Sequence, residues 1–264
     1  MNKIEVKVID MHNDPGGMMM FLAKLTQRGH NIKNMDDLLE LYVNSASPKS
    51  STVSAVAQLP HGTIKRFTPI TVAIVGASRR FLAQARTNQV GFTYVSASLQ
   101  YSDYSGEADF VVPYALMEAD AKDWTVSRAK GYLDSCKESM DTYKWLARET
   151  DNDTAGYAAP QGLRNILIMQ GNHQAWDYFI RLRSCHRNTN ETQYVTLRIW
   201  EELLKTDYGK EFFKYAGPDC AFGACREGKM CCGNPVRKLA KQSMEGEKSL
   251  PRLMLEEGWP LLYG

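Results

Sequence analysis

Neutral hydrogen-bonding side chains are dense in residues 93–102, and two basic side chains, Arg79 and Arg86, precede them. Hydroxyl and amide groups both donate and accept hydrogen bonds, so they suit the wall of a site for a polar ligand. Residue types alone favour the plainer alternative, a helix followed by a solvated loop. The hydrogen-bonding residues of this segment are Thr93, Tyr94, Ser96, Ser98, Gln100, Tyr101 and Ser102.

Thiols are concentrated within residues 217–233. Four thiolates can hold a zinc ion tetrahedrally, although structural zinc sites usually carry CxxC pairs and the spacing here is irregular. Two interpretations stay open, a metal site and a loop of reduced thiols, and the irregular spacing favours the thiols. The four cysteines are Cys220, Cys225, Cys231 and Cys232.

The polar segment at 93–102 needs a scaffold, and the sequence predicts a strand and a helix directly before it. Residues 70–76 form an apolar run typical of a buried strand. Ser78 can cap a helix that should end by Gly91, where a glycine follows the last periodic residue. A strand, a glycine turn and a helix resemble a phosphate-binding unit, but a single glycine falls far short of GxGxxG.

The N-terminal part alternates between strand and helix signals. Residues 4–10 alternate apolar and polar side chains and predict an opening strand. Residues 14–17, Asp-Pro-Gly-Gly, predict a turn before a short helix over 18–28. Asn34 or Asp36 should cap the next helix.

Two later regions predict longer helices. Residues 118–149 carry an apolar stripe at helical spacing, which we interpret as core or subunit interface rather than a cofactor site. Residues 172–205 carry two further apolar stripes and predict two helices around a polar connection.

The composition is that of a globular protein of 264 residues, with 44% apolar and 23% charged residues and a formal net charge of +2. No run of five basic residues occurs, so no nucleic-acid surface is expected. No stretch approaches the roughly 18 apolar residues of a membrane helix, and the N-terminus lacks the apolar core of a signal peptide. We therefore expect no membrane segment, a cytoplasmic location, and cysteines that are reduced or metal-bound.

Several short motifs resemble the core of the flavin-dependent thymidylate synthases. The first is His61-Gly-Thr63, and the second is Gly76-Ala-Ser78-Arg79, followed by Gln84. The third is Ser98-Leu-Gln-Tyr101, which resembles the family's Ser-x-Arg-Tyr loop. The resemblance extends over about residues 1–235.

A second region, 172–191, carries the rest of the resemblance. Asn172 matches the asparagine that begins a flavin-binding helix of the family, and Arg183 matches its pyrimidine-binding arginine at the same distance. Glu191 matches a glutamate farther along. On chemistry alone, Arg183 could equally be a buried ion-pair partner of Glu191.

The sequence departs from the family at cationic positions. The Arg-His-Arg triplet falls on Thr87, Asn88 and Gln89, and an alternative register starts it at Arg86. The loop arginine is Gln100. Two further arginines are also replaced, one at Gln174 on the flavin side and one at Gly156, where the family contacts nucleotide phosphate.

The resemblance implies a set of site residues. Arg183 would be the catalytic residue, stabilising charge on the pyrimidine ring. The residues implied to bind FAD are His61, Thr63, Thr87, Asn88, Gln89, Asn172 and Gln174. The residues implied to bind the nucleotide are Gln84, Arg86, Ser96, Ser98, Gln100 and Arg183.

The resemblance also implies a fold and an activity. The fold would be α/β (α+β), with a mixed sheet and long helices, in one domain over residues 1–264 with a Cys-rich extension at about 217–264. The chain would form a homotetramer whose active sites lie where subunits meet. Each site would use FAD, methylenetetrahydrofolate and NADPH to methylate carbon 5 of dUMP, giving dTMP.

The lost cations leave two alternatives open. One is a hydroxymethylase for a pyrimidine deoxynucleotide, dUMP or dCMP. The other is an inactive family member that serves as a binding or subunit partner.

Overall fold

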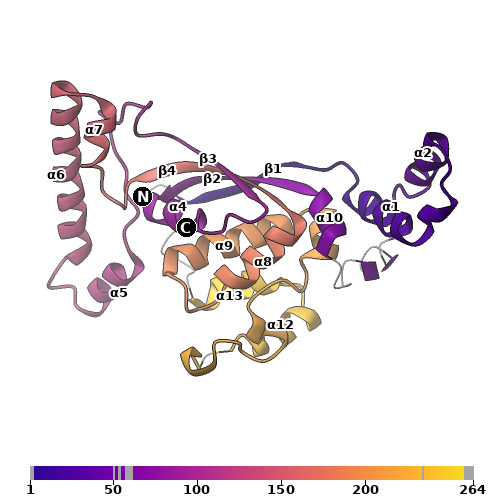
Figure 1. Ribbon diagram of the computed structural model, residues 1–264. Coiled ribbons are helices and arrows are strands. Elements are labelled where there is room, and N and C mark those ends of the chain that lie inside the picture. The colour runs from indigo at the N-terminus through magenta and orange to yellow at the C-terminus, as the bar shows by residue number, and fades with distance from the viewer. Residues whose placement is uncertain (1–2, 50, 53–54, 57–61, 234, 259–264) are drawn as a thin grey trace.

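A four-stranded sheet forms the centre of the computed structural model, which describes residues 3–49, 51–52, 55–56, 62–233 and 235–258. The spatial order of its strands is β1-β2-β4-β3 (Figure 1). The expected α+β class with long helices is confirmed. The expected mixed sheet is wrong in one respect, because all three strand pairings are antiparallel. In the β3–β4 pair, the connecting chain leaves β3 and enters β4 at the same end of the sheet. The strands are β1 (Glu5–Met11), β2 (Pro69–Ser78), β3 (Phe92–Ser96) and β4 (Arg164–Asn172).

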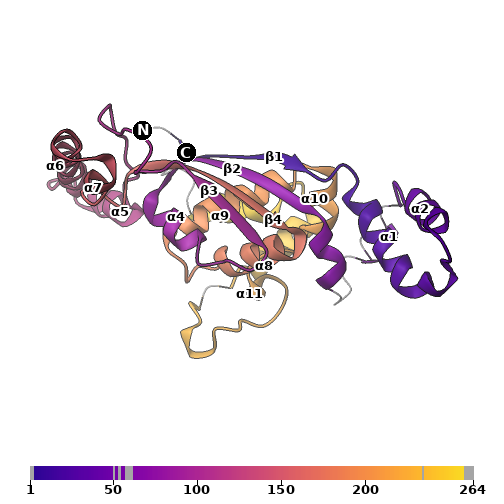
Figure 2. The same ribbon diagram turned by 45° about the horizontal axis from the view of Figure 1, so that its top comes forward.

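One face of the sheet carries the main hydrophobic core. Ile70, Val72 and Ile74 alternate along β2 toward this face and are fully buried. Helices α8 (His173–Arg183) and α9 (Asn190–Leu203) cover it, as the tilted view shows (Figure 2). The strands predicted at 4–10 and 70–76 and the two helices predicted within 172–205 are therefore confirmed.

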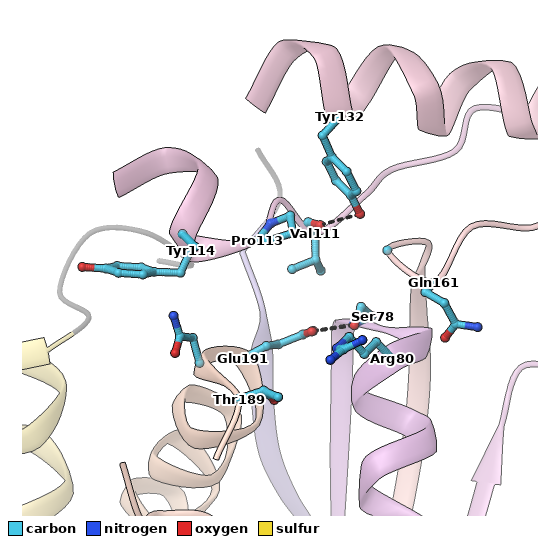
Figure 3. A pocket seen from close by; sticks show the side chains of 12 residues that line it. Ser78, Arg80, Val111, Pro113, Tyr114, Tyr132, Gln161, Thr189 and Glu191 are labelled. Atoms are coloured by element: carbon cyan, nitrogen blue, oxygen red, sulfur yellow. Dashed lines mark hydrogen bonds between the residues drawn. The ribbon is translucent and has the colours of Figure 1, made fainter. Parts of the chain in front are cut away.

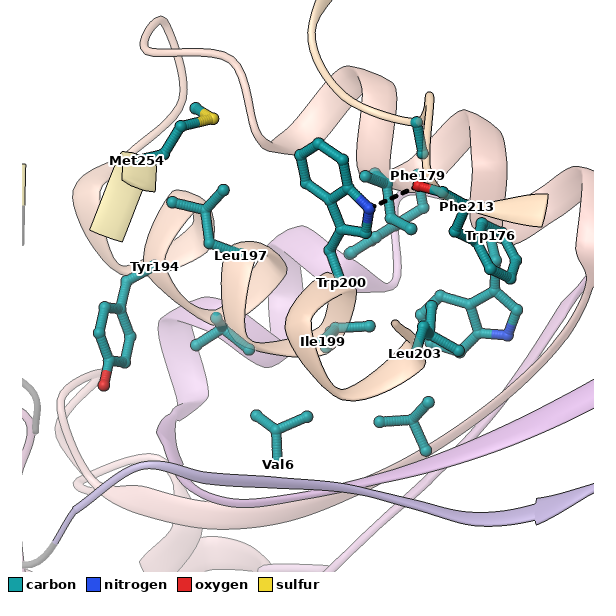
Figure 4. Packing of buried hydrophobic residues seen from close by; sticks show 14 of the residues in the cluster. Val6, Trp176, Phe179, Tyr194, Leu197, Ile199, Trp200, Leu203, Phe213 and Met254 are labelled. Atoms are coloured by element: carbon teal, nitrogen blue, oxygen red, sulfur yellow. Dashed lines mark hydrogen bonds between the residues drawn. The ribbon is translucent and has the colours of Figure 1, made fainter. Parts of the chain in front are cut away.

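Two buried tryptophans fasten these helices. The indole N–H of Trp176 donates to the carbonyl oxygen of Ile70 at 3.0 Å, which ties α8 to β2. The indole N–H of Trp200 in α9 donates to the carbonyl oxygen of Phe213 at 2.8 Å (Figure 4). Each indole thus buries a large apolar surface while its one polar group stays hydrogen-bonded, which avoids the cost of an unpaired donor.

The opposite face of the sheet carries an exposed apolar patch beside polar residues such as Glu5, Lys7 and Gln170. Val75 of β2 pairs with Ile166 of β4, and Ile168 of β4 pairs with Val95 of β3. Val75, Ile166 and Val95 are 44%, 46% and 65% exposed, respectively. The helices that the structure describes leave this face open (Figure 2). An exposed apolar patch of this kind is typical of a surface that binds another molecule.

Helix α4 (Arg79–Ala85) follows β2 directly, as predicted. The hydroxyl oxygen of Ser78 accepts from the backbone N–H of Phe81 at 3.1 Å and caps the helix. The chain then turns through Gly91, whose φ of +79° favours glycine. The prediction of a loop over 93–102 is wrong for its first part, because Phe92–Ser96 form β3. Its polar residues concealed the strand, which is anchored by Phe92 against Trp176 at 4.9 Å between ring centroids.

The predicted helix over 118–149 is two helices, α5 (Tyr114–Lys122) and α6 (Arg128–Glu149). The break forms because the Asp120 carboxylate accepts from the backbone N–H groups of Arg128 and Ala129, both at 2.9 Å, and so caps α6. Trp124 lies in the break and is 87% exposed, so it does not belong to the apolar stripe.

Helix α6 carries a second, smaller core, together with α7 (Asn152–Gly156). In Figure 1 both helices lie beyond one end of the sheet. The buried members of this core are Phe110, Cys136, Met140, Tyr143, Ala155 and Leu163.

At the other end of the sheet lie α1 (Pro15–Arg28) and α2 (Met35–Val43) (Figure 1). The turn predicted at 14–17 is wrong, because these residues begin α1. Asp14 caps the helix by accepting from the backbone N–H of Gly17 at 2.8 Å, and Pro15 takes the first helical position, where its missing N–H costs nothing. Asn34 caps α2, as predicted.

The C-terminal part folds onto α9. Leu239 and Leu250 are buried in the main core. Among the described residues, no helix combines the length and apolar character needed to cross a lipid bilayer. The elements here are α10 (Asp207–Phe212), α11 (Asp219–Phe222), α12 (Arg237–Glu245) and α13 (Leu250–Gly258), with short 3-10 turns elsewhere at η1 (Gly29–Asn31), η2 (Gly62–Phe67) and η3 (Gly228–Met230).

Candidate active site

Arg183 lies in the last turn of α8 and reaches across to the end of α4. Its Nη2 donates to the hydroxyl oxygen of Thr87 at 2.7 Å and to the carbonyl oxygen of Gln84 at 3.3 Å. Its Nη1 donates to Oδ1 of Asn188 at 3.2 Å. The Nε atom is buried and has no hydrogen-bond partner among the described residues. Partial burial lowers the pKa of Arg183 from its ordinary value, and a guanidinium with an unused buried donor suits a hydrogen-bonding ligand.

The Gln84 side chain is held in one orientation beside this arginine. Its Oε1 accepts from the hydroxyl of Thr189 at 2.8 Å and also from the hydroxyl of Thr192. Both threonines belong to the start of α9, so α9 positions a residue of α4. With its carbonyl oxygen occupied, Gln84 offers its amide N–H₂ as the remaining polar group.

Arg86 and Ser96 are joined across the turn between α4 and β3. The Nη2 atom of Arg86 donates to the hydroxyl oxygen of Ser96 at 2.5 Å. Arg79 lies at the start of the same helix. Burial lowers the pKa of Arg79 most, and the charge of Arg86 lowers it further. Neither arginine forms an ion pair within the described part of the chain. Two neighbouring cations without carboxylate partners favour an anionic ligand.

Tyr94 belongs to this group, although the sequence singled it out only as one of several hydroxyl residues. Its hydroxyl donates to the carbonyl oxygen of Ala85 at 2.9 Å and also contacts that of Asn88. Burial raises the pKa of Tyr94 to about 12, against the opposing effect of the nearby Arg183. The alternation of strand β3, once known, is the signal that directs Tyr94 toward α4 and α8.

The remaining members of the Ser-x-Gln-Tyr segment build a turn. The hydroxyl oxygen of Ser98 accepts from the backbone N–H of Gln100 at 3.1 Å and of Tyr101 at 3.4 Å. Gln100 itself is exposed. A Cβ atom on Gly156 would meet the side chain of Leu99 at 3.3 Å, so the loop that carries an arginine in the family does approach this segment.

Two of the residues expected to bind FAD, Asn172 and Gln174, lie at the other end of α8. Asn172 caps the helix, with Oδ1 accepting from the backbone N–H of Ala175 at 2.9 Å. Gln174 accepts at Oε1 from Nε of Arg66 at 2.7 Å. Thr63 is an exposed residue of η2, and His61 lies outside the described residues.

The two groups of residues stand apart in one chain. Gln174 and Arg183 lie at opposite ends of α8, an eleven-residue helix that is about 16 Å long at 1.5 Å per residue. The turn after α4 passes between these ends: Thr87 contacts Arg183, and the N–H of Asn172 donates to the carbonyl oxygen of Gly91 at 3.3 Å. Within the turn, Asn88 donates from Nδ2 to the carbonyl oxygen of Ala85 at 3.2 Å.

Glu191 does not pair with Arg183. Its Oε1 accepts from the backbone N–H of Ser78 at 2.7 Å, and its Oε2 accepts from the Ser78 hydroxyl at 2.5 Å. Burial raises the pKa of Glu191, and the two hydrogen bonds from Ser78 oppose that shift. The carboxylate thus joins the starts of α4 and α9 and borders a cavity of about 500 Å³ (Figure 3).

The structure describes all four cysteines of the predicted metal site. The structure divides them between two environments: Cys220 is buried in the main core, whereas Cys231 and Cys232 are exposed. Within the described residues, no group of three or more His, Cys, Asp or Glu side chains is placed to hold a metal ion. The reduced-thiol interpretation agrees with the six free cysteines.

Comparisons with known proteins find relatives in sequence and in fold. A relative from Geobacter sulfurreducens, a flavin-dependent thymidylate synthase, is 23% identical over 245 residues, which span 90% of this chain and 99% of the relative. A second, from Thermococcus kodakarensis, is 27% identical over 176 residues, or 64% of this chain and 69% of the relative.

The solved structures include a flavin-dependent thymidylate synthase from Helicobacter pylori in complex with FAD and dUMP. It matches 81% of this chain and 99% of its own, at 15% identity and a TM-score of 0.60, and therefore shares the fold. The profile of the family described as thymidylate synthase complementing protein matches residues 7–207. Because this match spans most of the chain, the protein belongs to the thymidylate synthase complementing protein family.

Proposed function

We propose that this chain is an FAD-dependent enzyme that transfers a one-carbon unit from methylenetetrahydrofolate to carbon 5 of dUMP, giving dTMP, with NADPH as reductant. The observation that carries the proposal is the contact between Arg183 and the end of α4, which joins positions 84, 87 and 183 across 96–99 residues of sequence. By the resemblance, positions 84 and 183 bind the nucleotide and position 87 binds FAD, and the relatives named above are flavin-dependent thymidylate synthases.

Arg183 is the residue proposed to act on the pyrimidine. Its Nε is an unused buried donor, and a guanidinium can donate two parallel hydrogen bonds to a ring oxygen and nitrogen. The reaction builds negative charge on the uracil ring when carbon 5 attacks the one-carbon unit. A fixed cation beside the ring stabilises that charge without rearranging.

The phosphate of the nucleotide is assigned to Arg79 and Arg86. Both lie on or next to α4, close to each other, and neither is neutralised by a carboxylate among the described residues. A charge-assisted hydrogen bond to phosphate contributes roughly 1.5–3 kcal/mol. Two such contacts can replace the family arginines that are absent at Gly156 and Gln100.

The residues at the N-terminal end of α8 fit an anionic dinucleotide such as FAD. Arg66 supplies the positive charge that Gln174 lacks, and the Asn172 amide N–H₂ stays available because its oxygen alone is used for capping. When bound, FAD supplies a hydride and methylenetetrahydrofolate supplies the carbon. The chain's own contribution is to bind, orient and stabilise charge.

The complete site is proposed to require a second subunit. Asn172 and Gln174 lie at one end of α8 and Arg183 at the other, about 16 Å apart, so contacts from a further subunit would complete the enclosure of a flavin and a pyrimidine. The exposed face of Val75, Ile166 and Val95 offers an apolar surface for a further copy. A homotetramer with shared sites accounts for both features, and a cytoplasmic location stays a prediction.

Spectroscopy and calorimetry test the proposal. We expect purified, denatured protein to release a yellow chromophore with the absorption of FAD, and the flavin-loaded protein to bind dUMP and to form dTMP when methylenetetrahydrofolate and NADPH are added. Binding of dCMP instead, or a hydroxymethyl product, would move the assignment to a hydroxymethylase. A folded protein that binds neither flavin nor nucleotide would show that the chain is a non-catalytic member.

A further inference from the structure

The cavity of about 500 Å³ that Glu191 borders lies where helices α4 and α9 begin. One wall of this cavity is apolar and aromatic, and it comes from residues 111–115 and from α6. In Figure 3 this wall lies opposite Ser78 and Glu191. Its members are Val111, Pro113, Tyr114, Ala115 and Tyr132. Pro113 and Ala115 are exposed, so part of the apolar wall faces solvent.

The polar groups of the cavity favour a ligand without a large net charge. One cation, Arg80, and one carboxylate, Glu191, border it. Both carboxylate oxygens of Glu191 already accept hydrogen bonds from Ser78. The exposed side chains of Arg80 and Gln161 can donate to carbonyl oxygens, which every peptide segment carries. An apolar wall with donors at its border suits an uncharged stretch of polypeptide.

Helix α13 points toward this cavity, because it packs on α9 in the opposite direction. Leu250, at the start of α13, lines one cavity together with Leu204, which follows the end of α9. Two residues farther on, Nη1 of Arg252 lies 3.6 Å from Oε1 of Glu201. Figure 4 shows Met254 still farther along, beside the first turns of α9. The two helices are therefore antiparallel, and α13 ends toward the start of α9.

The residues after α13 are long enough to enter the cavity. From the level of the Arg252–Glu201 pair, Gly258 lies about 9 Å along α13 and Asn190 lies about 16 Å along α9, at 1.5 Å per residue. Residues 259–264, which lie outside the described part of the chain, span about 20 Å when extended. This length exceeds both the difference between the two helix ends and the ~10 Å that separates packed helix axes.

The composition of this segment matches the cavity wall. Residues 259–263 are Trp, Pro, Leu, Leu and Tyr, without a charged side chain. Large apolar side chains gain free energy when they leave water, so a run of them favours contact with an apolar surface. Pro260 also disfavours helical backbone at the residue before it, which suits a segment that leaves α13 and crosses to a neighbouring element.

We propose that residues 259–263 dock in the cavity at the start of α9, against the wall formed by residues 111–115 and Tyr132. The docked segment covers the exposed side chains of Pro113 and Ala115 and joins α13 to the segment before α5. Thr189 borders the same cavity and donates to Oε1 of Gln84 at 2.8 Å, so the contact also supports the candidate nucleotide site. The docking does not depend on the proposed enzymatic activity.

Photo-cross-linking in the full-length chain tests this contact. Benzoylphenylalanine in place of Tyr263 should attach to residues 111–115 or to Tyr132 under near-ultraviolet light, as peptide mapping with fragmentation locates it. The same probe in place of Tyr215, an exposed residue after α10, is the control and should not reach these residues. A mixture of isotope-labelled and unlabelled chains distinguishes contacts within one chain from contacts between chains. Attachment to another surface, or only between chains, would overturn the proposal.

Variants on the two sides of the contact provide a second test. Ala115→Trp fills the cavity at an exposed position and should abolish the cross-link, whereas Ala115→Ser should keep it. Leu262→Asp should lower the melting temperature by several degrees, because it places a charge against an apolar wall. Val90→Asp, the same kind of change at a position that is 91% exposed, is the control and should leave the melting temperature unchanged.

Circular dichroism confirms that each variant folds. A cross-link that persists in Ala115→Trp, or a melting temperature of Leu262→Asp equal to that of the wild type, would show that this segment does not occupy the cavity.

Discussion

The guanidinium Nε of Arg66 donates to Oε1 of Gln174 at 2.7 Å, across 108 residues of sequence. Gln174 stands where the family carries a flavin-side arginine, and Arg66 comes from η2, in the chain segment before β2. The positive charge missing from α8 is therefore present beside it, supplied by a different element. Under the proposed function, Arg66 supplies beside α8 the cation that an arginine at position 174 would carry.

Arg66→Ala should weaken FAD binding about tenfold, or ~1.4 kcal/mol, because the exposed cation contributes less than a buried one. Equilibrium dialysis or flavin fluorescence titration measures the change. The double variant Arg66→Ala with Gln174→Arg should restore affinity, since it returns the charge to α8. Arg148→Ala, an exposed arginine at the end of α6, is the control. Unchanged flavin affinity in Arg66→Ala would remove Arg66 from the cofactor site.

Arg183→Ala should abolish turnover while leaving flavin content nearly unchanged, because Arg183 lies at the opposite end of α8 from Arg66 and Gln174. Losing an electrostatic contact made to developing charge typically costs about 10²–10³ in kcat. Steady-state kinetics and flavin stoichiometry, measured on the same sample, give the result. The control is Arg181→Ala, two residues away in the same helix, whose half-buried side chain pairs with Asp219 instead of α4. Equal loss in both variants would indicate damage to the helix rather than to the site.

Arg86→Ala should weaken dUMP binding by roughly 1.5–3 kcal/mol, or about ten- to a hundredfold. Arg79→Ala should act in the same direction, and the two effects should fall short of additive because the arginines are neighbours. Calorimetric titration of flavin-loaded protein provides both affinities. Deoxyuridine, which lacks the phosphate, should bind all variants alike. A loss that is equal for the nucleoside and the nucleotide would place these arginines away from the phosphate.

His173 should make the fold sensitive to acid. It is buried against Phe213 and accepts or donates at Nδ1 with the Tyr208 hydroxyl at 2.8 Å. Burial, with a smaller effect from Lys65, lowers the pKa of His173 to about 3 from its ordinary value of 6.5. Between those values the unfolded chain binds the proton and the folded chain does not. The contribution of His173 to the free energy of unfolding is therefore complete above pH 6.5. It is lost as the pH falls toward 3, by at most ~1.4 kcal/mol per pH unit.

Urea unfolding at pH 7 and pH 5 measures this dependence. His173→Gln, which removes the titrating group but can still hydrogen-bond to Tyr208, should be less stable than wild type at pH 7 and should show a smaller loss on acidification. The exposed His30→Gln in η1 serves as the control. An unaltered pH dependence in His173→Gln would mean that other groups carry the acid sensitivity.

Local patterns in the sequence determined several helix caps and strands of this fold. Ser78 and Asn34 cap the helices they were expected to cap, because a capping bond spans only three residues. The apolar run at 70–76 became β2, in which Ile70, Val72 and Ile74 face the core while Val75 faces the open side. Where a distant group intervened, local reasoning failed. The carboxylate of Asp120 broke the predicted long helix, and packing of Phe92 on Trp176 made a strand from a polar segment.

The candidate active site shows the same difference between what the sequence indicates and what the packing decides. The resemblance of the sequence to a known family pointed to Arg183, Gln84 and Asn172, and contacts across about a hundred residues of chain then joined Arg183 to Gln84 and Thr87. Only the tertiary structure paired Glu191 with Ser78 instead of Arg183, and only it put Arg66 beside Gln174. Spacing along a chain reports neighbours on one helix or strand. Charge and hydrogen-bond pairing between elements depend on how those elements pack, which a linear pattern does not encode.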